Sequence, residues 1–272
     1  MPFVKKYWKF ILAGIITLII LVCSLFYLLF NPKSILRSNQ TQNTTSSGNS
    51  TSSSNNSQAE NSSDGPIKAI GVNLDYYDSS TNRSGDFFFT KQKLQFNRVF
   101  MPYGFVIPGN STSTGKDKAN PQPTFVVPSG TKVLSLIDGI VFNIGKVWSG
   151  DYSIQVSADG GGSSLIFETE HVLNPVVKKG DKVKAGQVVA EVSDFDKSVP
   201  DGYGTVEIGV LQGGNPPQHL CPFLYLDTSV KQQITTKIQD LMKNWESYIG
   251  DNSLYDETLP TPGCITTEPI EG

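Results

Sequence analysis

Hydrophobic and polar residues follow different patterns in successive parts of the chain. Residues 10–30 form an apolar run without a charged residue, whereas residues 38–65 are mostly Ser, Thr, Asn and Gln. From residue 66 onward, short runs rich in β-branched and aromatic residues alternate with Gly, Pro and Asp. That pattern is typical of an antiparallel all-β domain. Apolar residues then recur at helical spacing over residues 228–250, which predicts an amphipathic helix closed by Gly250.

Ten short runs in the β-type region predict strands. Because they recur at intervals of about 8–12 residues with turn signals between them, the expected fold is mainly β, a half-barrel or β-sandwich. The predicted β domain covers residues 66–227, and a polar, acidic tail follows the helix at residues 251–272. The predicted strands are residues 69–74, 86–90, 97–103, 124–127, 132–136, 139–144, 153–156, 164–168, 187–192 and 205–210.

The apolar run at residues 10–30 predicts a transmembrane signal-anchor helix. About 20 apolar residues cross a hydrocarbon core of about 30 Å, and a cleaved signal peptide has a shorter run. Three lysines in residues 1–9 place that segment in the cytoplasm by the positive-inside rule. We therefore expect a single-pass protein of the cell membrane with a disordered Ser/Thr/Asn-rich linker at residues 31–65 and an extracytoplasmic C-terminal domain.

The distribution of charged residues along the chain limits the classes of ligand that the protein is expected to bind. The 272 residues contain 22 Lys and Arg, 25 Asp and Glu and two His. Residues 1–37 hold five basic residues and no acid, so the rest of the chain carries 17 basic and 25 acidic residues. An acidic body repels phosphate backbones, so we expect no nucleic-acid partner. The two histidines, His171 and His219, also restrict any metal chemistry.

Two stretches repeat one pattern of turn, strand, glycine turn and strand. The first runs from V-P-S-G-T-K-V at residues 127–133 to 138–141, and the second from V-K-K-G-D-K-V at residues 177–183 to 184–189. Over about residues 120–227 the chain resembles the duplicated hybrid motif of biotinyl/lipoyl carriers, sugar-phosphotransferase carrier domains and lysostaphin-type (LytM-like) zinc metallopeptidases. The A-M-K-M hairpin, on which such carriers bear a cofactor, is missing.

The order of motifs along the chain is most similar to the peptidases. That resemblance implies H-x-x-x-D early, a central His, and H-x-H late. The early His, the Asp and the second late His would hold zinc, and the other two histidines would assist the attacking water. Here V-P-S-G-T places Asn120 and Thr124 at the early positions, and His171, nine residues before Gly180, takes the central position.

The late motif aligns through Glu207 and places Tyr203 and Thr205 where the two late histidines belong. The three implied zinc positions then carry Asn and Thr side chains, which are poor ligands for zinc. We therefore expect a pseudoenzyme that binds no cofactor, and we assign no catalytic residue. His171 is retained at the central His position. Its remnant groove is expected to contain Asn120, Thr124, His171, Tyr203, Thr205 and Glu207.

The roles of the cysteines and of His219 can be interpreted in two ways. His219 and Cys221, with Glu168, Glu170 or Glu207, could rebuild a zinc site. Alternatively, Cys221 and Cys264 form an even pair outside the membrane and join in a disulfide, with Cys23 left in the bilayer. We favour the disulfide.

The expected function is a membrane-anchored, catalytically inactive peptidase-like domain used for surface binding or assembly. Its ligand would be a surface glycan, peptide or protein. The alternative is an active zinc metallopeptidase of cell-wall or surface peptides with a non-standard metal site, and a third possibility is a purely structural spacer.

Overall fold

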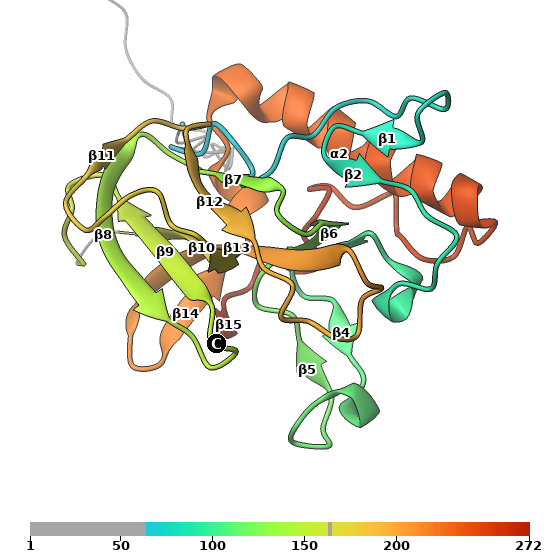
Figure 1. Ribbon diagram of the computed structural model, residues 1–272, viewed down its shortest axis with the longest axis horizontal. Helices are drawn as coiled ribbons and strands as arrows, with labels where there is room; N and C mark the ends of the chain where they lie inside the picture. The colour runs from blue at the N-terminus through green and yellow to red at the C-terminus, as the bar shows by residue number, and fades with distance from the viewer. Residues whose placement is uncertain (1–63, 163–164) are drawn as a thin grey trace, which may run out of the picture. The chain divides into compact units, whose positions relative to one another are not determined.

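The computed structural model describes residues 64–162 and 165–272 (Figure 1). The predicted segments at residues 1–9 and 10–30, and all but the last two residues of the predicted linker, lie outside these residues. Within the described part, no helix combines the length and apolar character needed to cross a bilayer.

Antiparallel strands form one large sheet. Its main path is β11 (Lys182–Val183), β8 (Gly139–Lys146), β9 (Tyr152–Ser157), β10 (Ile166–Leu173), β13 (Tyr203–Gly214), β14 (Pro217–Leu220) and β15 (Ile270–Glu271). Beside this path lie β3 (Phe100–Met101), β6 (Thr124–Pro128), β7 (Lys132–Leu134) and β12 (Val188–Val192). The prediction of a mainly β domain is confirmed. In the described residues this path does not close into a barrel, because the end strands β11 and β15 each pair on one side.

Short elements complete the domain. They are the pairs β1 (Arg83–Ser84) with β2 (Phe87–Phe88) and β4 (Val106–Ile107) with β5 (Lys118–Ala119), and the 3-10 turns η1 (Gln95–Asn97), η2 (Gly109–Ser111) and η3 (Pro222–Tyr225). The predicted strand at residues 69–74 does not form. Gly71 there has φ +85° and lies so close to Ile208 that a Cβ would approach its side chain to 2.7 Å. This left-handed residue interrupts the extended run.

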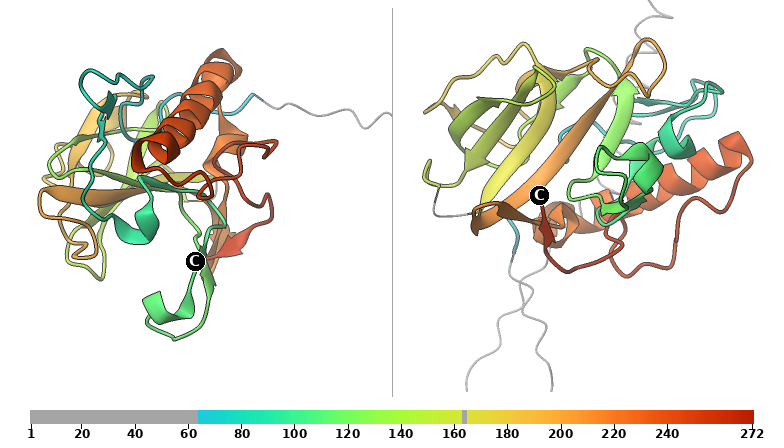
Figure 2. Two further views of the ribbon diagram at one scale, coloured as in Figure 1. Left: turned by 90° about the vertical axis from the view of Figure 1, so that its right-hand side faces the viewer. Right: turned by 90° about the horizontal axis from the view of Figure 1, so that it is seen from below.

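The predicted C-terminal helix is confirmed as α2 (Thr228–Ile249), which lies along one side of the sheet domain (Figures 1 and 2). The Asp227 side chain caps its N-terminus by accepting a hydrogen bond from the Ser229 N–H, and Gly250 ends it in the left-handed conformation. Trp245 is buried, packs edge-on against Phe89 and donates a hydrogen bond to the Asn97 carbonyl at 2.8 Å. The helix therefore packs its apolar face against the domain.

The predicted disulfide is confirmed. Cys221, after β14, is bonded to Cys264 in the tail. The tail continues to β15, which adds to the edge of β14. The buried Tyr103 hydroxyl donates to the carbonyls of His219 and Glu268 at 2.7 and 2.8 Å, so it joins the tail to β14 a second time. These contacts fix the acidic tail against the domain.

Candidate functional site

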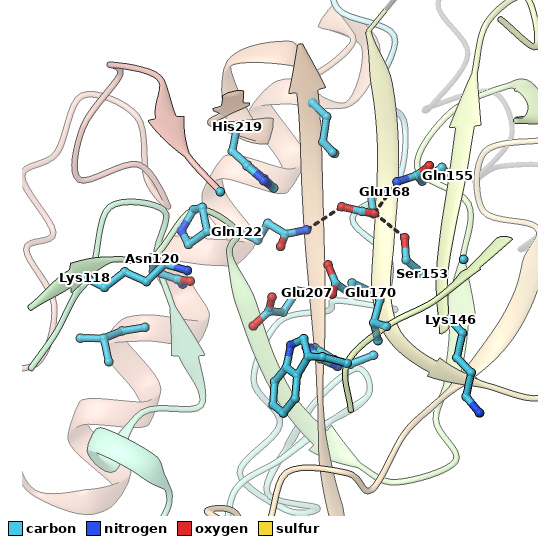
Figure 3. Close-up of a pocket in the computed structure, with 18 residues that line it drawn as sticks. Lys118, Asn120, Gln122, Lys146, Ser153, Gln155, Glu168, Glu170, Glu207 and His219 are labelled. Carbon is cyan, nitrogen blue, oxygen red and sulfur yellow. Dashed lines mark hydrogen bonds between the residues drawn. The ribbon is translucent and has the colours of Figure 1, made fainter. Parts of the chain in front are cut away.

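A cavity of about 510 Å³ lies on the face of β9, β10 and β13 (Figure 3). Successive side chains of a strand point to opposite faces, so Glu168 and Glu170 of β10 share a face, as do Ser153 and Gln155 of β9. Glu207 of β13 lies opposite Glu170 in the strand register. Alternation along three neighbouring strands therefore produces a polar floor with three carboxyl groups.

Glu168 is buried at the centre of a hydrogen-bond network (Figure 3). Its carboxylate accepts from Gln122 Nε2 at 3.0 Å, from Gln155 Nε2 at 2.8 Å and from the Ser153 hydroxyl. Burial raises the pKa of Glu168, and these three donors oppose that effect. Glu168 is thus held in place by protein groups.

Glu170 and Glu207 have fewer partners. Burial, reinforced by the charges of Glu168 and Glu207 and opposed by a hydrogen bond from the Gln122 side chain, raises the pKa of Glu170 to about 8. Burial is also the main cause that raises the pKa of Glu207 to about 7, against a hydrogen bond of 3.2 Å from the Thr124 hydroxyl. No ion pair in the described residues involves either carboxyl group. Both groups therefore carry a desolvation cost that the domain leaves largely uncompensated.

A β-bulge directs His171 to the same cavity. The pairing of β10 with β9 shifts register between Glu170 and Val172, and His171 has φ +62°. Its Nδ1 lies 3.3 Å from both carboxylate oxygens of Asp151 and 3.2 Å from the Ser149 hydroxyl. Burial lowers the pKa of His171, and Asp151 opposes this shift. The bulge explains how two adjacent residues both line the cavity.

The residues predicted for the groove are only partly brought together. Asn120, His171 and Glu207 line the cavity. Thr124 adjoins it, because its hydroxyl accepts from Asn120 Nδ2 at 3.3 Å as well as donating to Glu207. The other two, Tyr203 and Thr205, are not among the lining residues.

Strand register accounts for the separation. Thr124 pairs with Glu207, whereas Thr205 pairs with Val126 and Tyr203 with Pro128, farther along β6. The Tyr203 hydroxyl donates to the Phe88 carbonyl at 3.3 Å, away from the cavity. The residue of the late motif that lies beside Thr124 of the early motif is therefore Glu207.

Other lining residues were not identified from the sequence. Gln122 and Gln155 bind Glu168, and Trp148 lines the cavity with 85% of its surface exposed. Glu168 and Glu170 were named only as candidates for a rebuilt zinc site, although their spacing by two residues places both on one face of a strand.

The side chains at the implied zinc positions do not fit zinc. Asn120 and Thr124 contribute an amide and a hydroxyl; the Asn120 amide donates to the Thr124 hydroxyl, which in turn donates to Glu207. Zinc prefers imidazole, thiolate and carboxylate ligands. Across residues 64–162 and 165–272, no three His, Cys, Asp or Glu side chains are grouped so that one metal ion could be held.

The rebuilt zinc site with His219 and Cys221 is also not supported. Cys221 is bonded to Cys264 and offers no thiolate. His219 does line the cavity, and it is 6% exposed. Burial, with a smaller effect of Lys118, lowers its pKa to about 4, so the imidazole is neutral at pH 7. Its buried Nδ1 has no hydrogen-bond partner among the residues that the structure describes.

Comparisons with known proteins agree with the fold. Residues 123–213 match the family model Peptidase family M23. No curated protein matches the chain. Among solved structures, the catalytic domain of the antimicrobial peptidase lysostaphin from Staphylococcus simulans is 21% identical, with 46% of this chain and 89% of that chain covered and a TM-score of 0.36.

Two further solved structures are similar. The catalytic domain of a prophage-encoded M23 protein, EnpA, from Enterococcus faecalis is 20% identical, with 55% and 94% covered and a TM-score of 0.31. A chain of the SpoIIQ–SpoIIIAH pore-forming complex is 15% identical, with 63% and 98% covered and a TM-score of 0.37.

For some of the similar structures, this chain covers less than half of their length. The chain covers 44% of a LytM-type structure from Ruminococcus gnavus and 37% of an M23-type structure from Pseudomonas aeruginosa. The part of the sequence that matches the family model includes β6, β10 and β13, the strands that carry Thr124, His171 and Glu207. The chain therefore contains a LytM-like domain with the fold of the M23 peptidases.

Proposed function

We propose that this M23 peptidase-like domain is a non-catalytic binding module, anchored in the cell membrane by residues 10–30 and exposed on the extracytoplasmic side. Its cavity takes a surface ligand, and the protein acts in binding or assembly. The anchor and the side of the membrane rest on the sequence pattern.

One observation carries the proposal. The segment from Asn120 to Thr124 and the facing Glu207 use their polar groups in hydrogen bonds to one another, where the resemblance implies metal ligands. The fold is retained around them, and the cavity keeps a volume of about 510 Å³. A polar cavity with an exposed Trp at its wall suits ligand binding.

The second candidate is an active hydrolase with a displaced metal site. It is favoured by His171, whose Nδ1 is oriented by Asp151 in the way that carboxylates orient histidines in many active sites. It requires a set of metal ligands other than the side chains at the implied positions. We rank it below the binding module for that reason.

A binding screen tests the proposed function. The full-length protein is screened against surface glycans and peptides, and every hit is repeated with Trp148→Ala, which removes the exposed indole. Val176→Ala, at another exposed apolar residue, is the matched control. We expect at least one ligand whose binding is weakened by Trp148→Ala alone. The absence of any ligand would support a structural spacer and contradict the proposal.

A further inference from the structure

We propose that the cavity binds a primary ammonium group of a peptide, of the lysine type, between the carboxyl groups of Glu170 and Glu207 with the indole of Trp148 at its wall. This inference rests on the proposed binding function and names the class of ligand. It requires no metal and no chemical step.

The charges around the cavity support a cationic ligand. Glu168 has three donors, whereas Glu170 is opposed in its burial only by the Gln122 side chain and Glu207 by the Thr124 hydroxyl and the more distant charge of Lys118, and no ion pair in the described residues involves either group. Lys118 and Lys146 also line the cavity, but both are exposed and remain unpaired with these carboxyl groups. An ammonium group would supply the missing opposite charge and up to three N–H donors.

Trp148 adds a second feature suited to an organic cation. It is 85% exposed, and its ring lies edge-on to His171 and Phe195, at 6.1 and 5.8 Å between centroids. A cation over the face of an exposed indole is attracted by the ring electrons, and more strongly when it is desolvated. The aliphatic stem of a lysine side chain also gains by packing on an aromatic face.

His219 is an independent sign of a missing ligand. Its Nδ1 is buried without a partner within residues 64–162 and 165–272 although the side chain lines the cavity, and Figure 3 shows the ring directed inward. Because the imidazole is neutral at pH 7, it can accept a hydrogen bond or donate one, according to tautomer. A peptide N–H that reaches Nδ1 would remove the cost of leaving this atom unpaired.

The depth of the carboxyl groups favours a peptide over an amino sugar. Glu170 and Glu207 are partly buried in the floor, and desolvation is the main reason why their pKa values are raised. A lysine-type group reaches such a floor on a thin, flexible stem, whereas the amine of an amino sugar is attached directly to the ring. The three carboxyl groups are not grouped for one metal ion, but separate oxygens can each accept from an ammonium.

Isothermal titration of the full-length protein tests the inference. The probe is acetyl-Gly-Lys-Gly-amide, and its partner is the same peptide with the lysine side chain acetylated. We expect the free ammonium peptide to bind at least about tenfold more tightly, which corresponds to about 1.4 kcal/mol. Equal affinity for the two peptides would overturn the inference.

Variants locate the site. Glu207→Gln and Glu170→Gln keep the side-chain size and remove the negative charge, so each should weaken binding of the ammonium peptide by about tenfold. Glu268→Gln, at an exposed residue of the tail, is the matched control and should leave the affinity unchanged. If either cavity variant fails to fold, Trp148→Ala gives the same test at an exposed position. Unchanged binding in the folded cavity variants overturns the inference.

The pH dependence gives a separate readout. Binding an ammonium favours the ionised carboxyl groups, so affinity should rise and protons should be released between pH 6.5 and 8.5. The acetylated peptide should show neither effect. The ionisable groups that face Glu170 and Glu207 from neighbouring elements are Glu168, Asp151, His171, Asp196, Lys118, Lys146 and His219.

The outcomes separate this inference from the proposed function. Binding of glucosamine oligomers in preference to the lysine peptide, or of neutral ligands alone, overturns the ammonium assignment and leaves a binding module. If none of these probes binds, the ammonium assignment is also overturned. The wider screen of surface glycans and peptides then decides whether the domain is a binding module. Zinc-dependent cleavage of a peptide contradicts the proposed function itself.

Discussion

Burial that is only weakly compensated is common to Glu170, Glu207 and His219 in the cavity. Glu170 and Glu207 have raised pKa values and His219 a lowered one, and in each case desolvation is the main cause. Each group therefore favours its neutral form in the folded protein. Keeping these groups in the floor of the cavity lowers the free energy of unfolding of the domain, and this decrease can be measured.

The free energy of unfolding should fall as the pH rises from 6.5 to 8.5. A folded carboxyl group with a raised pKa holds its proton where the unfolded chain has lost it, so stability is present at the lower pH and disappears through pH 7 to 8. We expect a loss of roughly 1–2 kcal/mol, measured by urea unfolding. His171 and His219 act in the opposite direction below about pH 6.5, which sets the lower limit of the window.

The variant Glu170→Gln provides the control for this prediction. It removes the group with the highest of these carboxyl pKa values, and most of the decrease between pH 7 and 8.5 should disappear with it. Glu268→Gln should keep the wild-type dependence. An unchanged pH profile in Glu170→Gln would contradict the assignment of the decrease to the cavity.

Asp151→Asn should lower the pKa of His171 further. The Asp151 carboxylate opposes the effect of burial by its charge and by its hydrogen bond to Nδ1, and the variant removes the charge. A titration of the imidazole protons by NMR measures the change. His219 is the other histidine of the chain and serves as an internal control. A His171 titration at the wild-type pH would contradict the pairing with Asp151.

At the scale of elements, the sequence predicts those helices and strands whose residue pattern is local in the chain. The helical spacing and Gly250 predicted a helix over residues 228–250, and α2 runs from Thr228 to Ile249. The longer strands followed from β-type runs, except at residues 69–74, where Gly71 adopts a left-handed conformation, whereas the short strands β1, β4, β5, β11, β14 and β15 were not predicted. Propensity does not reveal how a glycine is used in the fold.

The cavity was harder to predict because it depends on pairing between distant strands. Alignment through Glu207 placed Thr205 and Tyr203 in the groove, but the register of β6 with β13 sets Glu207 beside Thr124. A shift of two residues leaves the same side chains on one face and moves them along the strand. The bulge at His171 likewise arises from pairing and has no local sequence signal.

The disulfide should contribute strongly to the attachment of the tail. Cys221 and Cys264 are 43 residues apart, and the loop-entropy model gives about 4 kcal/mol for such a loop. The double variant Cys221→Ala/Cys264→Ala should lose roughly 3–4 kcal/mol of unfolding free energy, measured in urea. Cys23→Ala is the matched control and should keep the wild-type value. Equal stability of the double variant would show that the bond constrains little.

For the whole molecule, the domain combines a peptidase fold with a cavity of different chemistry. Residues 123–213 match the M23 family model, yet Asn120, Thr124 and Glu207 form a hydrogen-bonded set that does not suit zinc. Fold alone does not determine function, so the side chains in the cavity decide between a hydrolase and a binding module. In our proposal the retained fold supports a floor of carboxyl groups for ligand binding.

The zinc content of the full-length protein tests this account most directly. After equilibration with zinc and gel filtration, elemental mass spectrometry should find far less than one zinc per chain. The control variant Asn120→His/Thr124→Asp/Glu207→His places zinc-binding side chains at three adjoining positions and should retain more zinc than the wild type. One tightly bound zinc per wild-type chain, together with zinc-dependent cleavage of a peptide, would contradict the account.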